Sequence, residues 1–241
     1  MKKNIKIIKS DDFKYPLKTE GTKSKISIPS LTTFGFEYNN SIKSILKNKK
    51  SYYQDNKEKN LNWWDTCIRK NFIKLKSAYV HTLKNHNQYL IKNGAEPSKD
   101  RYIYRLQFDI YAETVYNVLI SSKNIAFQIL NIYYNLNIEE NKVSAKSIKK
   151  KMTDSFIEER LVSLEEHIKS TYKIRNSFTH KFPENQKAYR ADYSKKGNLE
   201  KQSTIIRNEF KPQEIMLNID ESIRFFAIFI NDLKMNMKLS S

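Results

Sequence analysis

Residues 104–131 read YRLQFDIYAETVYNVLISSKNIAFQILN and contain neither glycine nor proline. Apolar residues recur along this stretch at intervals of three and four, which is typical of an amphipathic α-helix. Ser98 or Asp100 is expected to cap this helix, which should continue to about Leu136. The predicted core stripe of the helix consists of Leu106, Ile110, Val118, Ile125, Ile129 and Ile132.

Three further stretches have the same period and predict three more long helices. They run from about Asp55 to Lys92, from a cap at Asp154 or Ser155 into Tyr172, and over about Gln213–Met237. Their apolar stripes are Leu61, Trp64, Ile68, Phe72, Leu75, Tyr79, Leu83 and Leu90; Phe156, Leu161, Leu164, Ile168 and Tyr172; and Ile215, Ile219, Ile223, Phe226 and Ile230. With four glycines and five prolines in 241 residues, the chain is predicted to be all-α, a bundle of four major helices.

The segments between these helices are expected to differ from one another. Residues Ser144–Met152 (SAKSIKKKM) predict a short basic helix or turn. Residues 183–210 show no clear period and predict a long loop before the last helix, which in a compact domain is usually functional or disordered. We therefore divide the chain into a basic N-terminal arm, residues 1–50, and a helical domain, residues 51–241.

The predicted arm carries much of the positive charge. Residues 1–50 contain 12 lysines and four acidic residues, whereas the whole chain has a formal net charge of +18. The arm is expected to be partly disordered, with short ordered pieces around Ile26–Phe36 and near Ile42–Leu46. Two interpretations of the arm stay open. It binds RNA electrostatically, or it is a solvated tail or a strap that packs on the helical domain.

Charge, cysteine content and hydropathy restrict the class of protein. The net charge of +18 favours a polyanionic partner, although the lysine-rich proteins that AT-rich genomes encode would explain it equally well. The single cysteine, Cys67, excludes a disulfide within these residues and a multi-cysteine zinc site. The first 18 residues do not resemble a secretory signal and no segment is apolar enough to span a membrane, so we expect a cytoplasmic protein.

The residues that indicate chemistry lie at the end of the third predicted helix. Residues 172–183 read YKIRNSFTHKFP, in which Arg175, Asn176 and His180 form an R-N-x3-H pattern. Arginine stays charged and presents a planar fork to phosphate oxygens, and histidine transfers protons near neutral pH. Such a pair fits metal-free cleavage of RNA through its own 2′-OH, which needs a proton acceptor, a proton donor and positive charge at the phosphorane.

R-N-x3-H near the end of the third helix of a four-helix bundle resembles the HEPN superfamily, and residues 104–131 resemble two of its groups, one of them the Apea-like group. The resemblance implies a metal-independent endoribonuclease that needs no cofactor, with Arg175 and His180 catalytic and Asn176 positioning the site. It further implies a homodimer that brings two motifs into one cleft. A role as a toxin or phage-defence effector, with an antitoxin or regulatory protein as a further partner, would fit such an enzyme.

The spacing of the motif raises a geometric problem. Residues five apart on an ideal helix point about 140° from each other, so Arg175 and His180 would not share a face. Convergence on one phosphate requires a bend or fraying after Arg175, or contributions from two subunits. Pro183 should place His180 in a loosened last turn, where the helix C-terminus favours a protonated imidazole.

Other polar and aromatic residues give weaker signals. Asp109 and Glu113 are candidates for orienting Arg175, or they are simply exposed to solvent. His81 and His86 are five residues apart, not the four that would favour a shared metal, and His167 is expected on the surface. The two tryptophans and the tyrosines would stack on bases or, more often at helical spacing, belong to the core.

Two other functional classes compete with the ribonuclease. One is a catalytically silent HEPN-like module that binds RNA or a protein partner through its basic surface. The other is a helical DNA-binding protein, which the absence of a short helix-turn-helix pair with a basic recognition face disfavours. The intact set of Arg175, Asn176 and His180 favours the enzyme.

Overall fold

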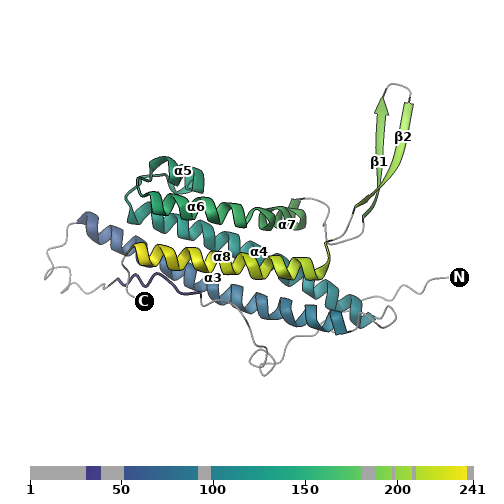
Figure 1. The fold of residues 1–241 in the computed structure, drawn as a ribbon, viewed down its shortest axis with the longest axis horizontal. Coiled ribbons are helices and arrows are strands. Elements are labelled where there is room, and N and C mark those ends of the chain that lie inside the picture. Colours follow the sequence, from purple (N-terminus) through teal and green to yellow (C-terminus); the bar gives the residue numbers. More distant parts are fainter. Residues whose placement is uncertain are drawn as a thin grey trace. The chain divides into compact units, whose positions relative to one another are not determined.

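The computed structural model describes residues 31–38, 52–91, 99–180, 188–196, 199–207 and 210–237. Helices predominate in these ranges, as the sequence predicts (Figure 1). The elements are α3 (Tyr52–Ile91), α4 (Lys99–Tyr133), the 3-10 turn η3 (Glu140–Lys142), α5 (Ala145–Lys151), α6 (Ser155–His167), α7 (Lys169–His180), β1 (Ala188–Lys196), β2 (Leu199–Arg207) and α8 (Pro212–Asn236).

The third predicted helix is interrupted, which the sequence does not signal with a glycine or a proline. Asp154 caps its start, as predicted, and accepts hydrogen bonds from the backbone N–H groups of Phe156 and Ile157. The chain leaves helical geometry at Ile168 (φ −91°, ψ 7°), where α6 ends before α7 begins. Ile168 is nevertheless buried, so the turn keeps the apolar stripe on the core side.

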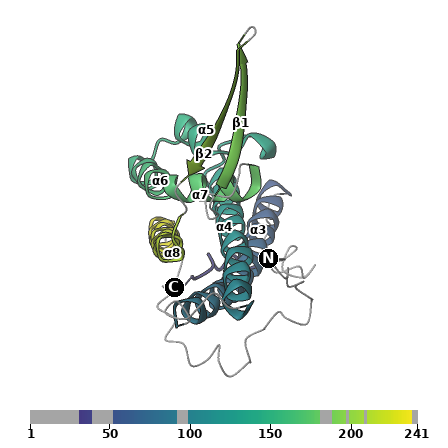
Figure 2. The ribbon, with the colours of Figure 1, turned by 90° about the vertical axis from the view of Figure 1, so that its right-hand side faces the viewer.

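The prediction of a long loop before the last helix is wrong for most of its length. Strands β1 and β2 pair as an antiparallel hairpin in which Ala188 lies opposite Arg207 and Lys196 opposite Leu199 (Figure 2). The strand signal is short: Thr204, Ile205 and Ile206 are β-branched, and Gly197-Asn198 is a dipeptide that commonly connects hairpin strands. A search for helical period misses both features.

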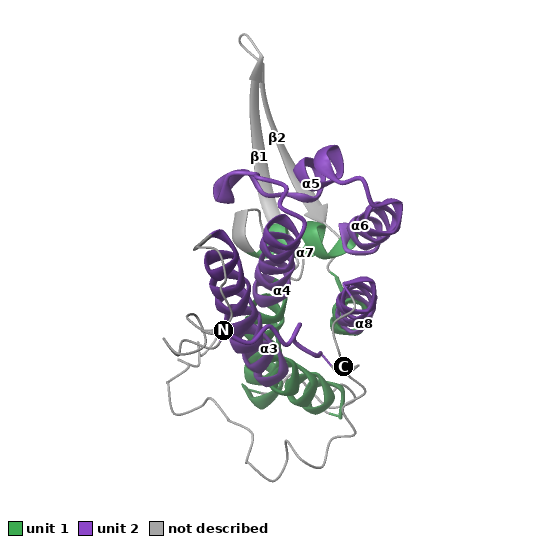
Figure 3. Cartoon of the chain, turned by 90° about the vertical axis from the view of Figure 1, so that its left-hand side faces the viewer, with its two compact units in different colours: residues 1–25, 78–116, 170–219 green, residues 26–77, 117–169, 220–241 purple. Residues whose placement is uncertain are grey.

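The chain divides into two compact units, which Figure 3 colours separately. Unit 1 comprises residues 1–25, 78–116 and 170–219, and unit 2 comprises residues 26–77, 117–169 and 220–241. Helices α3, α4 and α8 each contribute one segment to unit 1 and another to unit 2. Each unit therefore has its own helical core.

The core of unit 2 consists of aromatic and aliphatic side chains from α3, α4, α6 and α8. Phe72 meets Phe226 edge to face with ring centroids 6.2 Å apart, and Phe127 meets Phe229 in the same way at 6.3 Å. The fully buried aliphatic residues of this core include Ile68, Leu75, Ile129, Leu130, Ile157, Leu161, Ile230 and Leu233.

Part of the predicted arm belongs to unit 2 and packs into its core. Residues 31–38, which we call the strap, insert Phe34 into the core, where the ring is 1% exposed. The buried carboxylate of Asp65 on α3 accepts hydrogen bonds from the backbone N–H groups of Phe34 (2.7 Å), Gly35 (2.9 Å) and Phe36 (3.1 Å). Gly35 has φ +82°, which favours glycine. The strap is thus a packing segment, one of the two roles the sequence left open; the rest of the predicted arm lies outside the described residues.

The predicted core stripes hold for α8 and fail in part for α4. All five stripe residues of α8 are buried, whereas Ile110 of α4 is 47% exposed and its neighbours Phe108 and Ala112 are fully buried. Residues 104–131 are apolar on more than one face, so the period alone did not determine which face the core would take. None of the helices in the described ranges is long and apolar enough to cross a membrane.

Candidate functional site

Helix α7 presents a small, partly polar face to the core of unit 1. Thr171, Ile174 and Ser177, spaced by three residues, are all buried. The Ser177 hydroxyl donates to the Ile174 carbonyl oxygen at 2.6 Å, so its polar group is satisfied within the helix. This face fixes the rotation of α7 about its own axis.

A buried tyrosine fastens α7 to α4 and α8 in unit 1. The ring of Tyr116 on α4 lies 6.2 Å from that of Phe178 on α7. Its hydroxyl donates to the Asn218 side-chain oxygen (3.1 Å) and lies 3.3 Å from the Ile215 carbonyl oxygen, both on α8. The Asn218 amide in turn donates to the Ser170 hydroxyl on α7 at 2.7 Å. Burial raises the pKa of Tyr116 far above its usual value, so the phenol stays a neutral donor.

The predicted catalytic residues lie on this fixed helix. Arg175 and Asn176 are half-buried, and the Arg175 guanidinium Nη1 donates to the Asn176 side-chain oxygen at 3.2 Å. His180 is the last residue of α7, and its side chain lies outside the described residues. The bend or fraying expected after Arg175 is not found, because α7 is helical through His180; the interruption lies before the motif, at Ile168.

The Arg175–Asn176 hydrogen bond bears on the 140° problem. Asn176 and His180 are four residues apart in a continuous helix, so these two positions share one face of α7. The long Arg175 side chain reaches from its own position to the Asn176 oxygen. Its positive charge is therefore held beside the face that includes position 180, without a distortion of the backbone.

The charged side chains of α7 are all basic. Its sequence, KSTYKIRNSFTH, contains Lys169, Lys173 and Arg175 and no acidic residue. Lys173 is exposed, and its ammonium lies 5.3 Å from the centre of the Phe210 ring. A phosphate approaching this helix meets positive charge, which is what stabilisation of a phosphorane requires.

The two carboxylates proposed to orient Arg175 are on α4. Asp109 accepts the Arg105 Nε–H at 3.2 Å with each oxygen, in a pair whose side chains are mostly buried. Arg105, one turn earlier on the same helix, is thus one partner of Asp109, and the orientation of Arg175 by Asp109 stays a prediction. Glu113 is half-buried, and its orientation of Arg175 stays a prediction.

Sequence reasoning missed a group of buried polar side chains in unit 1. Thr82, Asn85 and His86 of α3 and Gln107 of α4 are each at most 8% exposed. Nearby on α3, the His81 ring stacks on Tyr111 of α4 with centroids 4.4 Å apart. The five-residue spacing of His81 and His86 did not indicate that His81 would stack on Tyr111 or that His86 would be buried. Within the described residues, no three metal-binding side chains gather.

Acid should destabilise unit 1 through His81. Burial, and secondly the charge of Lys84, lowers the pKa of His81 below the ordinary value of 6.5. The neutral imidazole is therefore favoured in the folded state, and its stabilising contribution, complete above pH 6.5, is lost as the pH falls towards the folded pKa. We expect urea unfolding midpoints to fall between pH 7.5 and 5, and His81→Gln to flatten this fall. His167→Gln is the control and should not; an equal effect of both changes would contradict the assignment.

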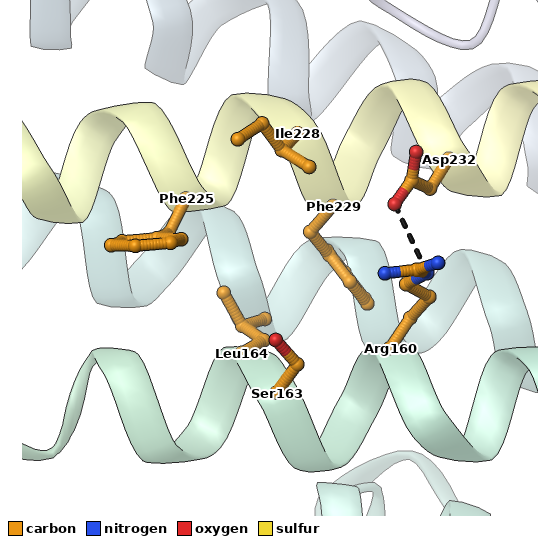
Figure 4. A pocket seen from close by; sticks show the side chains of 7 residues that line it. All are labelled: Arg160, Ser163, Leu164, Phe225, Ile228, Phe229 and Asp232. Carbon is orange, nitrogen blue, oxygen red and sulfur yellow. Dashed lines mark ion pairs between the residues drawn. The ribbon is translucent and has the colours of Figure 1, made fainter.

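Two pockets in unit 2 are poor candidates for a catalytic centre. One lies between α6 and α8, beside the pair formed by Arg160 and Asp232 (Figure 4). Nε of Arg160 and the carboxylate are 3.1 Å apart without hydrogen-bond geometry, and the cavity holds about 30 Å³, room for little more than water. His167 is exposed, as predicted, and its ring lies tilted against that of Phe225 at the edge of this pocket, with centroids 3.6 Å apart.

The other pocket is larger, at about 460 Å³, and lies where α3 begins and α4 ends. Its lining includes Tyr53, Lys57 and Tyr133. The Lys57 ammonium donates to the Tyr133 carbonyl oxygen at 2.7 Å, and burial lowers the pKa of Lys57. The Lys57 ammonium is thus already hydrogen-bonded to a backbone carbonyl group of the protein. Neither pocket brings together an acid, a base and a free phosphate-binding group.

The chain was compared with models of protein families, with curated proteins and with solved structures, and none of them matches it. The motif and its surroundings on α7 therefore provide the basis for a functional proposal.

Proposed function

We propose that this protein is a metal-independent endoribonuclease of the HEPN type, with Arg175, Asn176 and His180 at its centre. The observation that carries the proposal is the Arg175–Asn176 hydrogen bond on a helix that continues through His180. It accounts for the order R-N-x3-H: Asn176 holds the guanidinium beside the face that includes position 180. The contacts of Tyr116 and Asn218 with α7 support the proposal, since a phosphate-binding side chain has to be carried by a rigidly held helix.

In the proposed reaction the 2′-OH of RNA attacks the adjacent phosphorus and the bond to the 5′ oxygen of the next nucleotide breaks. Arg175 would neutralise the non-bridging oxygens, on which charge increases, and His180 would transfer a proton to or from the reacting oxygens. The 2′-OH loses one proton and the leaving 5′ oxygen gains one proton, so the reaction balances without water and without a metal ion. The products would be a 2′,3′-cyclic phosphate and a 5′-OH.

The test is cleavage of a 2′-OH-containing RNA by purified protein in EDTA, with the ends of the products identified by mass spectrometry. We expect a cyclic phosphate terminus in EDTA and no cleavage when the same sequence is supplied as DNA. Cleavage that EDTA abolishes and Mg²⁺ restores would refute the mechanism. Binding without any cleavage would favour the silent RNA-binding module instead.

We also propose that the active form is a homodimer with two motifs facing one basic cleft. Two copies would supply two sets of Arg175, Asn176 and His180 without any new sequence. Light scattering of the purified protein is expected to give twice the chain mass, and mixing Arg175→Ala with His180→Ala protein should restore activity if one site draws on both subunits. An active monomer would contradict this proposal. A regulatory protein or antitoxin as an additional partner would be sought among proteins that block this cleavage.

Deleting residues 1–30 should weaken RNA binding and leave chemistry intact. The deletion removes lysines, including those of residues 1–25 in unit 1, but retains the strap, residues 31–38, and its hydrogen bonds to Asp65. A loss of helical content on deletion would instead assign a packing role to the removed residues. With fewer phosphate contacts, RNA binding releases fewer counterions. We therefore expect a higher KM, a flatter salt dependence and a nearly unchanged kcat on saturating RNA. A KM and salt slope equal to those of the full chain would show that these lysines do not bind RNA.

A further inference from the structure

The outward face of α3 in unit 2 carries a stripe of cations around an exposed tryptophan. Lys59, Trp63, Lys70 and Lys74, which we call the α3 stripe, are separated by four, seven and four residues. On an ideal helix they fall within a sector of about 60°, and they span about 22 Å along the axis. The sequence alone left Trp63 either in the core or on the surface.

The exposed fractions of the side chains place Trp63 on the surface and not in the core. Trp63 is 60% exposed and Ile73, beside Lys74, is 67% exposed, although large apolar side chains are normally covered. The three lysines of the stripe are exposed as well. Trp64, the other tryptophan, is half-buried and does not belong to the stripe.

The acidic residues near the stripe on its helix are Asp55 and Glu58, which precede Lys59, and Asp65. Between residues 59 and 77 the one acidic residue is Asp65, and its carboxylate is buried under the strap, where it accepts three backbone N–H groups. Among the residues that the structure describes, no carboxylate pairs with a lysine of the stripe. From Trp63 to Lys74 the positive potential of this face is therefore not cancelled by an exposed carboxylate on α3.

We propose that the α3 stripe binds single-stranded RNA, with a base stacked on Trp63 and phosphates at Lys59, Lys70 and Lys74. An exposed indole among unpaired lysines fits a base and its backbone, since every base has a face for stacking. A duplex hides these faces in its own stack. An apolar protein partner fits less well, because interface cores are depleted of lysine. The choice of RNA over DNA rests on the proposed function; the single-stranded character rests on the stripe itself.

The first test uses the tryptophan itself as the probe, in protein carrying His180→Ala so that RNA stays intact. Trp64→Phe leaves Trp63 as the sole tryptophan, and Trp63→Phe leaves Trp64. We expect a 12-nucleotide oligouridine to quench the fluorescence of the first protein strongly and that of the second little. Trp63→Ala should weaken binding roughly tenfold. Equal quenching of both proteins, or an affinity unchanged by Trp63→Ala, would overturn the proposal.

The second test compares two matched pairs of lysines. Lys70 and Lys74 are exposed and four residues apart on α3, as Lys146 and Lys150 are on α5. Lys70→Gln/Lys74→Gln should flatten the dependence of log K on log salt by about 1.4, the value for two phosphates on a single strand. Lys146→Gln/Lys150→Gln, with the same change in net charge, should flatten it less. Equal effects of the two pairs would assign the binding to net charge and refute the stripe.

Failure of this inference is distinguishable from failure of the proposed function. Wild-type protein that binds oligouridine through Trp63 but never cleaves RNA would refute the ribonuclease and retain the stripe. Cleavage with the same KM in wild-type and Trp63→Ala proteins would retain the ribonuclease and refute the stripe.

Discussion

Replacing Arg175 or His180 by alanine is expected to reduce RNA cleavage at least about a hundredfold while the helical content stays unchanged. A positioned proton-transfer group contributes about 10²- to 10⁴-fold to a rate, and loss of one group that stabilises transition-state charge costs a similar factor. Arg175 is half-buried and takes no part in the Tyr116–Phe178 and Asn218–Ser170 contacts, so its removal leaves these contacts of α7 in place. Initial rates on one RNA, with far-ultraviolet circular dichroism of each variant, provide the measurement.

The companion variants separate charge from geometry. Arg175→Lys keeps the positive charge but loses the planar fork, so its rate should lie between those of wild type and Arg175→Ala. Asn176→Ala removes one hydrogen-bond partner of the Arg175 guanidinium but keeps its charge, and should reduce the rate less than either alanine change. Lys169→Ala, an exposed lysine on the same helix, is the control for net charge. Full activity of His180→Ala would rule out the assigned chemistry.

Asp65→Ala is expected to lower the free energy of unfolding by at least about 3 kcal/mol. The substitution leaves the backbone N–H groups of Phe34, Gly35 and Phe36 without their acceptor, and hydrogen bonds to a charged group contribute about 1.5–3 kcal/mol each. Water would satisfy these groups only if the strap detached, which would expose the buried Phe34 ring. Urea unfolding followed by circular dichroism gives the change in free energy.

Two variants test whether the strap causes this loss. Asp65→Asn keeps one acceptor oxygen and should cost less than alanine, whereas Glu221→Ala removes an exposed carboxylate from α8 and should have little effect. Protease digestion should cut the Asp65→Ala chain near residues 31–38 earlier than wild type. A loss of stability below about 1 kcal/mol, with no change in digestion, would mean that the strap contributes little to the fold.

The sequence was sufficient for features that depend on neighbours along the chain. Helical period and capping predicted α3, α4 and α8 to within a few residues, the cap at Asp154 and the buried stripe of α8. The R-N-x3-H spacing also singled out Arg175, Asn176 and His180, whose catalytic role stays a prediction. The bond between Arg175 and Asn176 joins adjacent residues, so this detail too is local. All of these interactions form within one or two turns of a helix.

Tertiary structure decided whatever depends on residues far apart in the sequence. The acceptor for the strap is Asp65, about 30 residues away, and Asn218 is 48 residues from Ser170 and 102 from Tyr116. No local pattern selects such partners, because many polar side chains along the chain would satisfy the same donor equally well. Packing likewise left Trp63 and Ile110 exposed on helices whose period allowed either side to be buried. Helical period specifies that a helix has an apolar face, but the shapes of the neighbouring helices determine which side chains that face buries.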